Sequence, residues 1–132
     1  MALEALAIEK AAVRITQQDL AQLRSLLEKM EATADVFDRA SFHKLDMAFH
    51  RKIWACASNE YLAIVLERVT FSLFAFQLLE RRPGDEVMKH VTEQHREILN
   101  ALLTGEPAVA RDRFVRATAN FWREHQHVNG SA

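Results

Sequence analysis

The sequence is poor in the residues that interrupt helices: of its 132 residues, 3 are glycine and 2 are proline. This scarcity disfavours an all-β fold, whose many tight turns depend on those residues. The single cysteine, Cys56, allows no internal disulfide, which favours a reducing compartment and therefore the cytoplasm. No run of about 20 apolar residues is present, so no contact with a membrane is expected.

Neither sign of charge dominates, because the formal net charge is −1. A surface this close to neutral lacks the basic field that holds proteins to phosphate backbones, so this chain by itself is not expected to bind DNA strongly. The length suits one domain with its own core, and a single domain over residues 1–132 is predicted.

Apolar residues recur at spacings of three and four in successive segments, which predicts amphipathic helices. Thr16 and Asp19 have the spacing of a capping box, Asn59 is a candidate N-cap, and Pro107 suits a first helical position. The expected helices cover 3–14, 16–30, 41–57, 59–80, 85–104 and 106 onward, with a loop at 81–84. Short connections between them predict an all-α antiparallel bundle.

The segment 59–80 is apolar on nearly all sides. Such a helix either lies at the centre of a bundle or is covered by another subunit, and the sequence leaves both alternatives open.

Two polar residues interrupt the apolar stripe of the third segment. Asp46 and His50 are four residues apart, so they lie on the same face of a helix, between Phe42, Phe49 and Ile53. A buried carboxylate requires a partner, a proton or a metal. His95 occupies a similar position in the fifth segment, and the three side chains form a plausible ligand set for a transition metal. The alternative is a hydrogen bond between Asp46 and His50 in the core, with His95 unrelated.

The same residues resemble the FCD domain, the C-terminal effector-binding domain of FadR-type GntR transcription regulators. The resemblance covers nearly the whole chain, and its most specific stretches are Asp46-x-x-Phe49-His50-x-x-Ile53, Ala57-Ser58-Asn59 and Glu93-Gln94-His95 with Ile98-Leu99.

This resemblance implies a bundle of six to seven helices and, in many members, a divalent metal (Zn, Ni or Mn) held by one Asp and three His. Asp46, His50 and His95 match three of these positions, whereas Ala117 stands where the fourth ligand is expected. The resemblance therefore leaves two alternatives: a three-ligand site that water or an effector completes, or a pocket without metal.

The resemblance also implies that the pocket binds a small carboxylate metabolite, with Arg14 as a candidate partner of the carboxylate. The expected pocket residues are Phe42, Phe49, Val69, Leu99, Ala117 and Phe121. A homodimer is expected, in which effector binding alters the spacing of two DNA-binding domains. The winged helix-turn-helix that makes DNA contact in GntR regulators is not expected within residues 1–132.

Two other functions compete with a sensor. One is a ligand-free helical dimerisation module with a packed core. The other is a non-haem metal enzyme, because two histidines and one carboxylate also bind catalytic iron. The helical bundle and the absence of an obvious second acid or base favour a protein that is not an enzyme.

Overall fold

A computed structural model describes the backbone of residues 2–80 and 85–130, and the side chains of residues 2–72 and 87–119. The described backbone forms six helices joined by short connections, which confirms the predicted all-α bundle. They are α1 (Ala2–Arg14), α2 (Gln17–Asp35), α3 (Arg39–Cys56), α4 (Glu60–Glu80), α5 (Asp85–Leu103) and α6 (Pro107–Gly130). The loop predicted at 81–84 lies outside the described residues.

The helices begin and end where the sequence provides partners for free backbone groups. Before α2, the Asp19 amide donates to Thr16 Oγ1 and the Thr16 amide donates to Asp19 Oδ2, at 3.1 and 3.0 Å, so the predicted capping box is present. Before α4, Asn59 Oδ1 accepts from the Leu62 amide at 3.0 Å. After α5, Gly105 adopts a φ of +68°, a left-handed conformation that glycine tolerates without strain.

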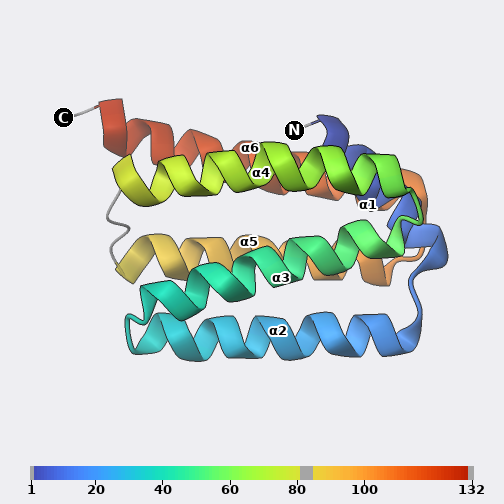
Figure 1. Cartoon of the computed structure of the whole chain (residues 1–132), viewed down its shortest axis with the longest axis horizontal. Coiled ribbons are helices and arrows are strands. Elements are labelled where there is room, and N and C mark those ends of the chain that lie inside the picture. Colours follow the sequence, from blue (N-terminus) through green and yellow to red (C-terminus); the bar gives the residue numbers. More distant parts are fainter. Residues whose placement is uncertain (1, 81–84, 131–132) are drawn as a thin grey trace.

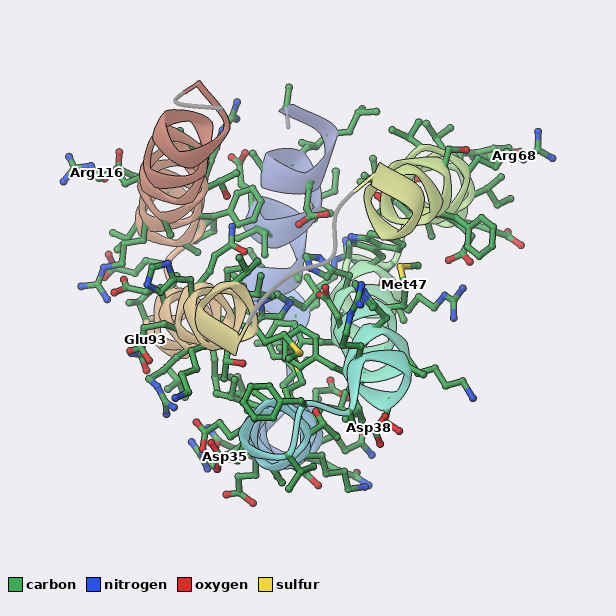
Figure 2. All side chains as sticks on the ribbon, turned by 90° about the vertical axis from the view of Figure 1, so that its left-hand side faces the viewer. Asp35, Asp38, Met47, Arg68, Glu93 and Arg116 are labelled. Carbon is green, nitrogen blue, oxygen red and sulfur yellow. The ribbon has the colours of Figure 1, made fainter. Side chains whose placement is uncertain are left out.

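Helices α2 to α6 run antiparallel to one another in succession, whereas α1 crosses the bundle obliquely and packs against α3, α4, α5 and α6 (Figure 1). Helix α2 covers α3 and α5 on the opposite side of the bundle. Viewed end-on, α4 lies at the periphery, where α3 and α1 are its neighbours and Arg68 points outward (Figure 2). The described part of α4 is therefore not central, which removes one of the two explanations for its broad apolar surface.

The core between the helices is mainly hydrocarbon, with Ile8, Leu23, Met30, Phe49 and Ile53 almost completely buried. Six polar or charged residues are nevertheless buried in the described part of the chain: Glu4, Asp46, His50, Thr70, Thr92 and His95. Among the described residues, no helix is both long enough and apolar enough to cross a membrane.

Candidate metal and effector site

Helices α3 and α5 bring the three predicted ligand residues together inside the bundle. Asp46, His50 and His95 are 6%, 9% and 1% exposed, and one donor atom from each lies within 4.8 Å of the others. The two alternatives drawn from the sequence differed on His95, and the structure places His95 beside the Asp46–His50 pair. The predicted convergence is therefore observed.

Asp46 Oδ1 is the common partner of the two imidazoles. His95 Nε2 lies 2.6 Å from this oxygen and His50 Nε2 lies 3.3 Å from it. The two rings meet edge to face, with centroids 4.9 Å apart. Both Nε2 atoms thus face one carboxylate oxygen in a space closed to solvent.

The second nitrogen of each ring has an acceptor of its own. His95 Nδ1 donates to the Val91 carbonyl oxygen at 2.6 Å, one turn earlier in α5. His50 Nδ1 lies 2.9 Å from Glu4 Oε1, in α1. The acceptors hold the Nδ1 hydrogens, so the Nε2 atoms are the ones available to a metal.

The donor set fits a divalent transition metal. Ligand atoms bound tetrahedrally to zinc are about 3.3 Å apart. Asp46 Oδ1 and His50 Nε2 already have this separation of 3.3 Å, while the 2.6 Å contact with His95 Nε2 has to lengthen. A carboxylate with two imidazoles suits zinc, nickel or manganese and leaves at least one coordination position open.

Glu4 is the member of this site that the sequence analysis missed. It is 5% exposed, and its Oε2 atom is buried without a hydrogen-bond partner among the described residues. Its position was readable in principle, because Glu4, Ile8 and Ala11 follow one another at helical spacing on the inner stripe of α1.

Each of these groups stabilises the charged form of its neighbours and so shifts their pKa values. Burial alone would lower the pKa of His50, but the charge of Glu4 and the hydrogen bond with Asp46 raise it to about 10. Burial would raise the pKa of Asp46, yet the charge of His95 and the hydrogen bonds from both imidazoles hold that pKa well below its usual range. Burial likewise opposes ionisation of Glu4, and the neighbouring His50 outweighs it, so the pKa of Glu4 is lowered.

Aromatic side chains close the site. The Phe49 ring lies 4.7 Å from the His95 ring, centroid to centroid, and Phe42 is buried nearby in the same helix. The Trp54 ring lies 6.1 Å from the His50 ring, and its indole Nε1 is buried without a hydrogen-bond partner in the described part of the chain. Trp54 follows His50 by one helical turn, so the spacing that linked Asp46 to His50 also indicated it.

The other predicted pocket residues are not gathered at this point. Arg14 is exposed at the end of α1, about 15 Å along the helix axis from Glu4. Val69 is 40% exposed on α4, and Ala117 is partly buried in α6. The side chain of Phe121 lies outside the described residues. The proposed ligand contacts of Arg14 and Val69 do not follow from this arrangement, because both side chains face outward.

Leu99 is buried in α5 and also borders a separate groove of about 310 Å³ at the surface between α2 and α5. Arg24, Glu28, Glu31 and Arg96 line the groove, and none of the three candidate ligands does. Arg96 pairs with Glu31 across it. This groove is thus distinct from the buried acid–imidazole cluster.

Comparisons with known proteins agree with the architecture. The family model described as "FCD domain" matches residues 1–123. A probable D-xylose utilization operon transcriptional repressor of Paenarthrobacter nicotinovorans is 26% identical over 109 residues, which cover 83% of this chain and 47% of that protein. The solved structure of E. coli McbR/YncC superposes with a TM-score of 0.76 at 22% identity, covering 93% of this chain and 64% of the other. The chain thus spans about half the length of the curated relative.

Proposed function

Because the chain belongs to the FCD domain family, we propose that it is the sensing domain of a GntR-type transcription regulator and binds a small carboxylate metabolite. The observation that carries this proposal is the buried cluster of Asp46, His50 and His95, contributed by two helices. A packed structural core would be expected to place hydrocarbon at these positions, since burying ionisable groups is costly.

Asp46, His50 and His95 would hold a divalent transition metal, which would supply an electrophilic centre with an open position for a carboxylate oxygen. Ala117 contributes no ligand atom, so within residues 2–72 and 87–119 the protein donors of this group are Asp46, His50 and His95. Phe49 and Trp54 would shield the two imidazoles from water. The Trp54 indole N–H, which has no partner in the described part of the chain, would donate to an anionic ligand.

Helix α3, which carries Asp46 and His50, would transmit a change in the site to its neighbours. Helix α3 packs against α1, α2 and α4, so a ligand that shifts Asp46 and His50 also shifts the contacts between α3 and three neighbours. The change is transmitted only if the ligand binds the two arrangements with different affinities.

In the complete regulator, DNA contact would come from a winged helix-turn-helix outside this chain. The resemblance to a probable repressor, of which the matched residues cover 47%, agrees with this assignment of sensing and DNA contact to separate domains. Such a regulator would work in the cytoplasm, where it meets both the metabolite and DNA, and its sensing domain would catalyse no reaction.

We also expect the domain to pair with a second copy through α4. Tyr61, Ile64, Val65, Val69 and Phe71 are all at least 40% exposed on this helix. A contiguous apolar surface of this kind is typical of protein interfaces, and a twofold axis is the commonest arrangement for identical chains.

Metal analysis and a thermal-shift screen of small carboxylates test the sensor proposal. The wild-type protein should bind about one equivalent of zinc, nickel or manganese, and an effector should raise its Tm saturably without being consumed. Asp46→Asn should abolish both responses, because it replaces the carboxylate that both imidazoles face with a neutral amide, which is a poor metal ligand. Consumption of the compound would instead indicate an enzyme, and no response to metal or carboxylates would indicate a structural module.

The dimer has a matched pair of variants. Val65→Asp alters the exposed face of α4, and Val115→Asp alters an equally exposed valine on α6, since the two side chains are 44% and 48% exposed. Sedimentation velocity should show a dimer for wild type and Val115→Asp and a monomer for Val65→Asp. A dimer in all three proteins would place the interface elsewhere.

A further inference from the structure

Glu4 stands outside the three-residue ligand set, yet it is as deeply buried as the residues of that set. It is 5% exposed in α1, whereas the predicted ligands come from α3 and α5. Its Oε1 atom lies 2.9 Å from His50 Nδ1, and its Oε2 atom has no hydrogen-bond partner among the described residues. A carboxylate with one unpartnered buried oxygen is costly to retain unless it serves the site.

Nothing in the packing of α1 requires a charge at this position. The neighbouring inner residues of the helix are Ala5, Ala7, Ile8 and Ala11, all of them apolar and buried. Among the described residues, the one hydrogen-bonding partner of this carboxylate is the Nδ1 nitrogen of His50.

We propose that Glu4 is the positioning residue of the metal site: it accepts the Nδ1 hydrogen of His50 and holds the Nε2 lone pair of that ring toward the bound cation. This inference rests on the proposed function, because it concerns the same metal. The carboxylate–imidazole–metal arrangement fixes both the orientation and the tautomer of the ring, and it increases the basicity of the ligating nitrogen.

The comparison with His95 supports this assignment. The Nδ1 hydrogen of His95 is also held by an acceptor, but this acceptor is a neutral group within the same helix, the Val91 carbonyl oxygen at 2.6 Å. His50 is held by a charged group from another helix. Glu4 therefore brings to the site a charge that the Val91 carbonyl does not bring.

The charge of Glu4 balances the metal-loaded site before a carboxylate ligand binds. A divalent cation with the carboxylates of Asp46 and Glu4 and two neutral imidazoles has no net charge. With Asp46 as the sole carboxylate, the same buried site would carry one positive charge, which the apolar surroundings disfavour. Since the chain has Ala117 where the family resemblance places a fourth ligand, a more basic His50 matters more here.

The spacing of the atoms assigns Glu4 to the outer sphere. The group of donor atoms within 4.8 Å of one another consists of Asp46, His50 and His95 and does not include Glu4. Its nearest described partner is the nitrogen of His50 that faces away from Asp46.

Zinc affinity of the complete 132-residue chain tests the proposal, measured by competition with a chromophoric chelator. Glu4→Gln retains an oxygen acceptor but loses the charge, and it should weaken zinc binding about 10-fold; Glu4→Ala loses both and should weaken it about 100-fold. Glu9→Gln is the control, because it makes the same chemical change on the same helix at a partly exposed glutamate that pairs with Arg111.

Two spectroscopic readouts separate positioning from simple structural support. In the zinc-loaded protein, nitrogen-15 NMR should show His50 bound through Nε2 in wild type and Glu4→Gln, and a mixture of Nε2 and Nδ1 binding in Glu4→Ala. Cobalt-loaded wild type and Glu4→Gln should have the same d–d absorption, because no ligand atom is exchanged. Circular dichroism checks that each variant folds. If Glu4→Ala does not fold, the isosteric Glu4→Gln still tests the proposal.

Each contrary result has a distinct meaning. Wild-type zinc affinity in both Glu4 variants overturns the positioning role while the metal site stands. A changed cobalt spectrum in Glu4→Gln overturns the outer-sphere assignment and makes Glu4 a ligand. Failure of the wild-type protein to bind zinc or cobalt overturns the proposed metal site together with this inference.

Discussion

Three consecutive residues of α3 each join that helix to a different neighbour. His50 contacts Glu4 of α1, Arg51 pairs with Glu67 of α4, and Lys52 lies 2.9 Å from Asp19 of α2. Successive residues of a helix point about 100° apart, which explains how one short stretch reaches three directions. The three contacts use similar charges but lie in different surroundings.

Exposure separates them. The side chains of His50, Lys52 and Arg51 are 11%, 27% and 49% exposed. Water and salt weaken an exposed ion pair, whereas a buried charge that loses its partner keeps the full cost of its desolvation. We therefore expect a substitution to lower stability most at the most buried of the three contacts and least at the most exposed one.

The largest effect is expected at the buried end. Asp46→Asn removes the charge that both imidazoles face and should lower the free energy of unfolding of the metal-free protein by about 3–5 kcal/mol, as measured by urea denaturation. Asp112→Asn, at a carboxylate that is 59% exposed, is the matched control and should cost less than about 1 kcal/mol. Equal effects of the two variants would contradict the difference between buried and exposed charges.

The stability of the metal-free protein should also depend on pH, because its buried charged groups have shifted pKa values. The pKa of His50 is raised from 6.5 to about 10, so its stabilising contribution is complete below pH 6.5 and is lost as the pH rises toward 10. The lowered pKa values of Asp46 and Glu4 act in the opposite sense, and their contributions are lost at acid pH. The Tm of the metal-free protein should fall by at least about 5 °C as the pH rises from 6.5 to 10.

A His50→Gln variant provides the control for this pH series. Because glutamine does not titrate, the Tm of the variant should fall less steeply over the same range. Parallel curves for the variant and the wild type would show that another group causes the alkaline loss.

Lys52→Met tests the intermediate contact. The methionine keeps an apolar stem of similar length and removes only the ammonium group that pairs with Asp19. The Tm should fall by less than in Asp46→Asn and by more than in Arg51→Met. Scanning calorimetry of the three variants at one pH measures this order. A Tm decrease for Lys52→Met that is larger than that for Asp46→Asn or smaller than that for Arg51→Met would contradict the link between burial and stabilisation.

The smallest effect is expected at the exposed end. Arg51→Met removes a bidentate contact with Glu67, in which 49% and 40% of the two side chains are exposed, and should cost at most about 1 kcal/mol in urea denaturation. Because about 1 M salt screens such pairs, the difference from wild type should largely disappear there. A cost that persists in high salt would show that packing of the arginine stem, rather than its charge, stabilises the contact.

Much of this arrangement was readable from the sequence. The Thr16–Asp19 capping box and the Asn59 cap correctly marked where α2 and α4 begin, and Gly105 correctly marked where α5 ends. All three are local signals. The spacing of Asp46 and His50 placed them on one face because an i, i+4 pair depends only on helix geometry.

Predictions that depended on how helices pack against one another were correct for some residues and not for others. His95 was correctly expected beside Asp46, whereas Arg14 and Val69 were expected at the pocket and are exposed. Helical periodicity does not identify the inner face of a helix that is apolar on nearly all sides, as α4 is, and it does not give the height at which a neighbouring helix crosses α1. Arg14 lies at the wrong end of α1 for that reason, although its helix does reach the site.

The sequence by itself determined six helices, their caps and the inward face of Asp46, His50 and His95, since backbone geometry repeats the same pattern in every helix. Only the tertiary structure decided that Glu4 of α1 lies against His50 of α3, and that α4 remains at the edge with its apolar side exposed. Those outcomes depend on how whole helices stack, and stacking is set by the summed fit of many side chains rather than by any local spacing.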